Sequence, residues 1–116
     1  MDDCVFCKIA AGQLPARKVF ENDYLLAFED LNPVAPVHVL LVPKTHYANL
    51  LEMTGSPQGL EDLKEINAAL PAVARALGLE SEGFRLIANC GENAGQTVMH
   101  VHFHLVGGQP LGPRIL

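Results

Sequence analysis

Residues 100–106 read HVHFHLV, and this segment decides how the rest of the chain is interpreted. Three histidines alternate with apolar residues, which is the period of a β-strand with one polar and one buried face. Alternate side chains on a strand lie about 6.6–7 Å apart, so we expect the three imidazoles to form a row. Val101, Phe103 and Leu105 should point the other way, into a core.

Two kinds of chemistry fit such a row. His100 and His102 form a His-x-His pair, which can chelate a metal ion. Alternatively, neighbouring imidazoles can supply a nucleophile and a proton donor around one bound anion. A strand face that merely meets solvent is disfavoured, because Thr, Lys or Glu would serve there equally well. The segment alone does not choose between the two chemistries.

The composition fits one globular domain over residues 1–116. The chain is 49% hydrophobic and 18% charged, and its length allows a single modest core. No apolar run approaches the roughly 20 residues of a membrane span, and the start shows no signal-peptide pattern, so no membrane association is expected. The net charge of −5 argues against nucleic-acid binding. Three cysteines without an export signal indicate a reducing, cytoplasmic protein.

Cys4 and Cys7 lie in the N-terminal segment CVFCKI. Asp2 and Asp3 are expected to open a short helix, and Gly12 to follow its end. The spacing of the two cysteines then places both on one helix face. Such a pair can be half of a zinc site, a redox pair, or two small buried residues, and the motif alone does not decide.

Four other segments have the character of strands. Residues 18–21 and 24–28 surround an Asn-Asp pair, which predicts a hairpin. Residues 37–43 are strongly apolar and predict a central strand. Residues 84–88 predict a fourth strand, which leads through a glycine-bearing loop into the histidine segment.

A long amphipathic helix is expected between the third and fourth strands. Ser56 and Pro57 give a helix-start signal, and Gly78 gives a stop. Pro71 predicts a kink near residues 67–70. The apolar residues recur at steps of three and four, as expected for a helix that packs on a core. They are Leu60, Leu63, Ile66, Leu70, Val73 and Leu77.

Three further places could carry chemistry. Asp30 follows the second strand, where it could cap a turn or accept hydrogen bonds from a sugar diol. His38 lies within the apolar third strand, where a core role is favoured over a site role. The loop at residues 89–97 reads NCGENAGQT. Its glycines let backbone N–H groups approach an anion, and Gln96 and Thr97 add side-chain donors.

Together these motifs resemble the histidine-triad family, and in particular its Hint branch of nucleoside phosphoramidases. The resemblance rests on CVFCKI, LAFEDL, HVLLVPKTH, NCGENAGQT and HVHFHLVGG, in this order. It implies an α+β fold, with an antiparallel sheet of about five strands, one long helix and a short N-terminal helix. It also implies a homodimer in which two sheets join.

The resemblance assigns a role to each site residue. His102 would be the nucleophile that attacks the α-phosphorus. His38, His100 and His104 would complete the catalytic group. Asn89, Gly95, Gln96 and Thr97 would meet the phosphate. The ribose and purine would contact Asp30, Val5, Phe6, Ile9, Phe28, Leu31 and Leu40.

The implied substrate is a purine nucleotide similar to AMP, cleaved at a phosphoramidate bond through a nucleotidyl-histidine. Dinucleoside polyphosphate hydrolysis and nucleotidyl transfer, in the same family, are alternatives. A zinc-dependent hydrolase and a nucleotide-binding scaffold without turnover are rivals from other classes. No cofactor is required for the expected catalysis. Some bacterial relatives bind a structural zinc, which here would use Cys4, Cys7, His46 and His100.

Overall fold

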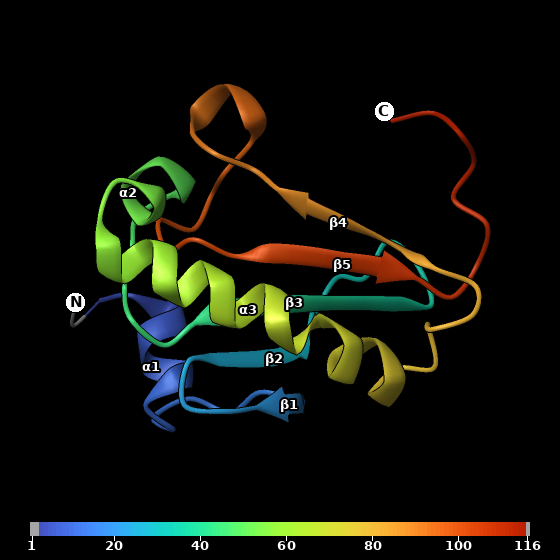
Figure 1. Ribbon diagram of the computed structural model, residues 1–116, viewed down its shortest axis with the longest axis horizontal. Coiled ribbons are helices and arrows are strands. Elements are labelled where there is room, and N and C mark those ends of the chain that lie inside the picture. The colour runs from blue at the N-terminus through green and yellow to red at the C-terminus, as the bar shows by residue number, and fades with distance from the viewer. Residues whose placement is uncertain (1–2, 116) are drawn as a thin grey trace.

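The computed structural model describes residues 3–115, which form a five-stranded antiparallel sheet with helices on both sides (Figure 1). This is the expected α+β fold, with one long and one short N-terminal helix. The elements, in order, are α1 (Val5–Ala10), β1 (Lys18–Glu21), β2 (Leu25–Glu29), β3 (Val37–Pro43), α2 (Leu50–Thr54), α3 (Pro57–Ala76), β4 (Phe84–Ala88), the 3₁₀ turn η1 (Glu92–Ala94) and β5 (Phe103–Gly107).

The strand order is β1-β2-β3-β5-β4, so β3 lies at the centre, between β2 and β5. The α3 face of the sheet buries Leu25 and Ala27 of β2, whereas Leu26 and Phe28 belong to a second cluster with α1. Because β2 and β3 are covered on both faces, they read as continuous apolar runs rather than as alternating ones. In Figure 1, α3 lies in front of the sheet.

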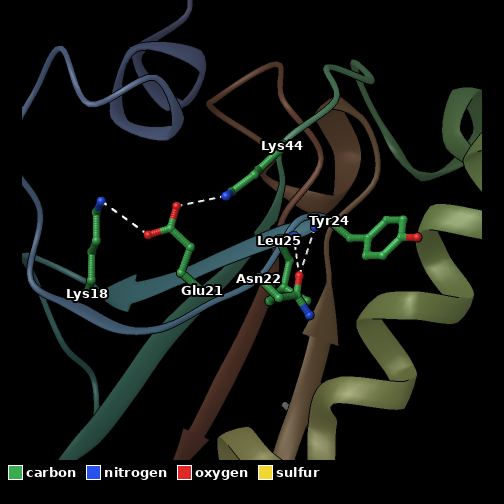
Figure 2. Close-up of polar contacts among 6 residues, drawn as sticks. All are labelled: Lys18, Glu21, Asn22, Tyr24, Leu25 and Lys44. Atoms are coloured by element: carbon green, nitrogen blue, oxygen red, sulfur yellow. Dashed lines mark hydrogen bonds and ion pairs between the residues drawn. The ribbon is translucent and has the colours of Figure 1, made fainter.

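The β1–β2 hairpin is held by side chains at its turn, as Figure 2 shows. Asn22 Oδ1 accepts hydrogen bonds from the backbone N–H groups of Tyr24 and Leu25, at 2.8 and 3.0 Å. Tyr24 therefore belongs to the turn, and β2 begins one residue later than expected. Glu21 pairs with Lys18 at 3.4 Å and with Lys44 at 2.7 Å, which ties the end of β3 to the hairpin.

Helix α3 begins as predicted, with Ser56 Oγ accepting a hydrogen bond from Gly59 N at 3.0 Å. The helix continues through Pro71 to residue 76. Most of the expected stripe packs on the core, since Ile66 and Val73 are buried and Leu63, Leu70 and Leu77 pack against the same cluster. Leu60 is the exception, because it is 52% exposed whereas Gly59 and Asp62 are buried. The short helix α2, which was not predicted, lies close against the first turn of α3: a Cβ atom at Gly59 would lie 1.7 Å from the carbonyl oxygen of Met53 in α2.

The N-terminal helix begins at Val5, later than expected, and its cap is not an aspartate. Cys4 is the N-cap, and its Sγ accepts a hydrogen bond from Cys7 N at 3.4 Å. Asp2 lies outside the described residues, and Asp3 lies in a turn before the helix. Gly12 follows the helix end with a φ of +79°, a conformation that favours glycine.

The histidine segment is only partly a strand, because β5 begins at Phe103 rather than at His100. Pairing with β3 stops at Leu41 opposite Phe103. Beyond this point Val101 N donates to Tyr47 O at 2.7 Å, and the Pro43 carbonyl accepts from the His100 ring. Groups that would continue the ladder are thus used elsewhere. The alternation persists nevertheless, since Val101, Phe103 and Leu105 all belong to the core under α3.

No helix within residues 3–115 is long and apolar enough to cross a membrane.

Candidate active site and metal centre

The histidine row lies on the α1 face of the sheet, opposite the core formed with α3. Phe6 of α1 packs edge-on against His102, with ring centroids 5.1 Å apart, and against His100 at 5.9 Å. His102 and His104 follow each other at 5.1 Å. Helix α1 therefore covers the start of the row, while the rings of His102 and His104 are only partly buried.

The ring of His102 is oriented by the backbone. Its Nδ1 lies 2.8 Å from the carbonyl oxygen of His100, which can only accept a hydrogen bond. Nδ1 therefore carries the proton in the neutral ring, and Nε2 keeps its lone pair. Among the hydrogen bonds of residues 3–115, none involves Nε2 of His102, so this atom is available to attack an electrophile.

His38 and His104 form a directly bonded pair beside His102. His38 Nε2 lies 2.8 Å from His104 Nδ1 and 3.5 Å from a carboxylate oxygen of Asp30. Burial lowers the pKa of His104, and the neighbouring His102 and His38 lower it further while Asp30 opposes them. His38 is 8% exposed. It is thus a satisfied buried histidine and also a neighbour of the row, so the two interpretations of His38 were not exclusive.

A cavity of about 780 Å³ opens beside His38, between α1 and strands β2 and β3. Its lining includes every residue that was expected to contact a nucleoside. They are Val5, Phe6, Ile9, Phe28, Asp30, Leu31 and Leu40. Phe28 and Leu40 are buried in its wall, whereas Leu31 is 94% exposed at the rim. The cavity has an apolar interior and a polar end formed by Asp30 and His38, as pockets for amphipathic ligands do.

Arg17 and Glu29 also line the cavity, although no sequence motif marked this pair as part of the site. Their side chains form an ion pair at 3.3 Å, with exposed fractions of 86% and 47%. An exposed pair of this kind contributes little to stability. The pair therefore adds charge at the mouth of the cavity rather than rigidity.

The loop before the histidines folds around Gln96. The Gln96 amide donates to the carbonyl oxygens of Ala48 and Val98, at 2.7 and 3.0 Å, and accepts from Gly91 N at 2.9 Å. This amide is committed to the loop, which corrects the expectation that it meets a phosphate. Gly95 has a φ of +82°, which turns the loop after η1.

The other two residues suggested for phosphate binding are accessible. Thr97 is exposed, and Asn89 is partly buried at the end of β4. Neither side chain forms a hydrogen bond with another residue in the described part of the chain, so both can offer donors to a ligand.

A cluster of possible metal ligands lies at the start of α1, where one ligand atom from each residue is within 4.8 Å of all the others. The cluster consists of Cys4, Cys7, His46 and His100. Cys4 Sγ and Cys7 Sγ lie 3.3 and 3.5 Å from His100 Nδ1. His46 Nδ1 lies 3.3 Å from Cys7 Sγ and 3.2 Å from His100 Nδ1. Zinc bonded tetrahedrally to sulfur and nitrogen separates its ligand atoms by about 3.3–3.8 Å, so the four residues fit this metal.

The protonation state of His100 also suits a metal, whereas Cys7 must lose its proton to bind one. His100 Nε2 lies 2.8 Å from the carbonyl oxygen of Pro43, so Nε2 holds the ring proton and Nδ1 presents its lone pair. Burial lowers the pKa of His100 to about 4, which keeps this ring neutral. Burial, and then the neighbouring Cys4 thiol, raises the pKa of Cys7 to about 11. A cation that displaces this proton would turn Cys7 into a thiolate ligand.

The cluster has four protein ligands, which is the arrangement of a closed structural site rather than of a catalytic one. His102 is not part of the cluster, because its Nδ1 is bonded to the His100 carbonyl group. The geometry therefore gives no support to the rival in which His100 and His102 together hold a catalytic zinc.

Two residues that sequence reasoning missed connect this cluster to α3. The hydroxyl of Tyr47 donates to Asp62 Oδ2 at 2.5 Å, and Gln58 donates to Asp62 Oδ1 at 2.9 Å. Tyr47 directly follows His46 in the chain, and both Tyr47 and Asp62 are buried. An aspartate among the polar positions of a helix gave no signal of this role.

The fold and the histidine row together define a small α+β protein of the histidine-triad class. The model of the HIT domain matches residues 11–111, and the chain belongs to this family. It is 42% identical to "Protein HitA" of Neisseria gonorrhoeae over 107 residues, which cover 92% of this chain and 97% of that protein.

Solved structures give the same result. The "HIT family hydrolase from Clostridium thermocellum" is 46% identical, with a TM-score of 0.93 and coverage of 100% of this chain and 99% of that one. The "histidine triad nucleotide-binding protein from Candida albicans" is 35% identical, with a TM-score of 0.79 and coverage of 89% and 73%.

Proposed function

We propose that this protein is a nucleotide hydrolase that cleaves purine nucleoside 5′-phosphoramidates, or related nucleotidyl conjugates. The observation that carries the proposal is the position of the cavity. Its apolar interior suits a purine, Asp30 suits the ribose hydroxyls, and the polar end at His38 leads to the histidine row. The hydrolase and the nucleotide-binding protein among its structural relatives support the same class of activity.

In the first step, the lone pair of His102 Nε2 attacks the α-phosphorus. A phosphorus–nitrogen bond to His102 forms, and the bond from phosphorus to the leaving amine breaks. The amine departs with a proton taken up from solvent, which leaves His102 as a cationic nucleotidyl-imidazole. In the second step water attacks phosphorus, the bond to His102 breaks, and the nucleoside monophosphate is released. The proton lost by this water returns to solvent, so no proton is consumed overall. Dividing hydrolysis in this way is ordinary covalent catalysis, and neutral imidazole is a suitable nucleophile near pH 7.

The groups around phosphorus would stabilise its developing charge. Asn89 and Thr97 would donate hydrogen bonds from their side chains. The backbone N–H of Gly95 already donates to Glu92 O at 3.0 Å, so Gly95 would contribute by letting the loop approach the phosphate closely. His104 adds a further ring nitrogen beside His102. These donors are neutral groups. They act in a partly enclosed site, where hydrogen bonds to an anion are stronger than in water.

The decisive experiment compares adenosine 5′-phosphoramidate with diadenosine polyphosphates as substrates. We expect the phosphoramidate to have the higher kcat/KM. Rapid quenching at alkaline pH, where a phosphorus–nitrogen bond to histidine survives, followed by intact-mass analysis, should reveal a nucleotidyl adduct that is absent from His102→Ala. A preference for diadenosine polyphosphates would assign the chain to the alternative activity. A protein that binds AMP but turns over neither substrate would be the nucleotide-binding scaffold.

We propose further that Cys4, Cys7, His46 and His100 hold a structural zinc ion. The donor set, the spacing of the ligand atoms and the hydrogen bond from His100 to Pro43 support it. When bound, zinc would fasten α1 to the loop after β3. Because α1 also carries Val5, Phe6 and Ile9, loss of zinc should lower thermal stability more than it lowers the chemical rate.

Elemental analysis of protein purified without chelator tests this second proposal. About one zinc per chain is expected, and Cys4→Ser should lose it. Cys90→Ser is the matched control, since Cys90 is also a partly buried free cysteine but lies outside the cluster. A zinc content well below one per chain, unaffected by Cys4→Ser, would contradict the proposal.

A further inference from the structure

A backbone group that no sequence motif marks reaches the histidine pair. The N–H of Val34, in the loop between β2 and β3, lies 3.2 Å from Nδ1 of His38. A backbone N–H can only donate, so Nδ1 of His38 must accept and must be without a proton. This one contact therefore fixes the state of His38: the ring is neutral, and its single proton is on Nε2.

The tautomer of His38 also determines that of His104. His38 Nε2 lies 2.8 Å from His104 Nδ1. With its proton on Nε2, His38 donates and His104 Nδ1 accepts. His104 must then carry its own proton on Nε2 when it is neutral. Among the hydrogen bonds of residues 3–115, none uses His104 Nε2, so this N–H remains free to meet a ligand.

We propose that the backbone N–H of Val34 is a positioning group that selects the tautomer of His104 through His38, so that His104 presents an N–H donor to the bound phosphoryl group or to the departing amine. The inference rests on the proposed function for its catalytic consequence, but the tautomers themselves are properties of the free protein. His102 next to it has the opposite tautomer, with Nε2 unprotonated. Adjacent rings thus provide a nucleophile and a donor.

The loop is built to hold Val34 in place. Pro33 immediately precedes Val34, and Pro36 stands two residues after it, which restricts the backbone. Asn32 N donates to Asp30 Oδ1 at 2.8 Å, and Asp30 N donates to His38 O at 2.9 Å. The side chain of Val34 is 72% exposed. The position therefore contributes through its backbone rather than through packing.

The carboxylate of Asp30 favours the same tautomer. Its Oδ2 lies 3.5 Å from His38 Nε2, so a proton on that nitrogen faces negative charge. The other oxygen, Oδ1, is engaged by Asn32 N. The Asp30 carboxylate thus lies near Nε2 of His38, and the Val34 N–H donates to Nδ1 on the other side of the ring. Both interactions place the ring proton on Nε2.

The first test needs no variant. Nitrogen NMR of ¹⁵N-histidine-labelled protein at pH 7.5 distinguishes protonated from unprotonated ring nitrogens. His38 and His104 should both show protonated Nε2 and unprotonated Nδ1, and His102 should show the reverse. A proton on Nδ1 of His104, or a doubly protonated His38, would overturn the inference. Neither result depends on substrate, so failure here is separate from failure of the proposed hydrolysis.

The second test removes the N–H alone. In Val34→Pro the donor is missing, whereas Val34→Ala keeps it and is the matched control. We expect mixed tautomers of His38 and His104 in Val34→Pro only. Its kcat should fall about five- to tenfold below that of Val34→Ala, the equivalent of one ordinary hydrogen bond, with KM within about twofold.

If Val34→Pro does not fold, the same comparison uses protein in which residue 34 is the corresponding α-hydroxy acid, so that an ester oxygen replaces the N–H. This variant keeps the side chain and the chain length. Unchanged tautomers of His38 in this protein would overturn the role of Val34. A shifted tautomer without any change in kcat would overturn its link to catalysis.

Discussion

His102 is the residue on which the proposed chemistry depends. We predict that His102→Ala abolishes turnover and leaves AMP affinity within about a factor of ten, or about 1.4 kcal/mol. The reason is that the alanine removes the nucleophile, whereas the cavity keeps its walls because His102 is not among the residues that line it. Steady-state kinetics and calorimetric titration check this. A variant that retains more than a few per cent of the rate would refute the assignment.

His104 makes a prediction about pH. Its pKa in the folded protein lies below that of a free histidine, about 6.5, mainly because of burial. The unfolded chain therefore binds more protons between the two pKa values, and stability falls as pH decreases through this window. In His104→Asn, the free energy of unfolding should depend less steeply on pH below 6.5. Urea unfolding at several pH values measures the slopes, and equal slopes would count against a depressed pKa.

At the scale of single residues, the sequence predicted the positions of side chains that could bind a ligand or a metal. The residues expected to contact a nucleoside line one cavity, and both cysteines meet both histidines of the expected metal cluster. What it could not reveal were the roles of backbone groups. The Val34 N–H, the Pro43 carbonyl group and the His100 carbonyl group each fix a histidine tautomer. Every residue has such groups, so no letter of the sequence marks them.

At the scale of elements, the contact between α3 and the loop after β3 is the next test. Tyr47→Phe removes the hydroxyl that donates to the buried carboxylate of Asp62. Gln58 alone would remain to satisfy this group, so we expect a loss of about 1–3 kcal/mol in the free energy of unfolding. Tyr24→Phe is the matched control, because Tyr24 is 39% exposed. Denaturant unfolding of both variants measures the difference.

A second readout distinguishes a local from a general effect of the same substitution. Tyr47 follows His46, and its carbonyl oxygen accepts from Val101 N, next to His100. If the contact positions the metal cluster, Tyr47→Phe should also weaken retention of zinc during dialysis against a chelator, whereas Tyr24→Phe should not. Equal unfolding free energies for the two variants would show that the buried pair contributes no net stability.

Elements were predictable where local signals agreed with the tertiary structure. β3, β4 and the start of α3 match, because turn residues and proline mark their ends. The helix α2 was missed, since five residues carry too little periodicity to be recognised. Within α3, only the first turn of the expected apolar stripe was wrong, because Leu60 is exposed. Gly59 lies there against Met53 of α2, a contact that the α3 sequence alone does not reveal.

For the whole molecule, the sheet separates two functions. One face packs under α3 and forms the larger core, while the other holds α1, the cavity and the histidines. Helix α1 is short, with six residues, and an isolated helix of this length is not stable in water. Its position therefore depends on packing at Phe6 and Ile9 and, in our proposal, on zinc. Substrate binding and metal binding should stabilise each other through this helix.

The outer strand β4 leads to the last prediction, a homodimer. Within residues 3–115, β4 pairs only with β5, and its outer backbone groups are unpaired. Phe84 and Leu86 on this strand are 39% and 36% exposed. An outer strand with exposed apolar side chains can pair with a strand of another chain. Two-fold pairing of β4 with β4 would join the sheets of two subunits.

Light scattering at micromolar concentration should therefore give about twice the mass of one 12.5 kDa chain. Leu86→Lys should shift the protein toward monomer, because a charge would be buried at the centre of the paired strands. Leu14→Lys is the matched control, since Leu14 is 38% exposed but lies outside β4. A monomeric wild type would refute the dimer. A dimer unaffected by Leu86→Lys would place the interface on another surface.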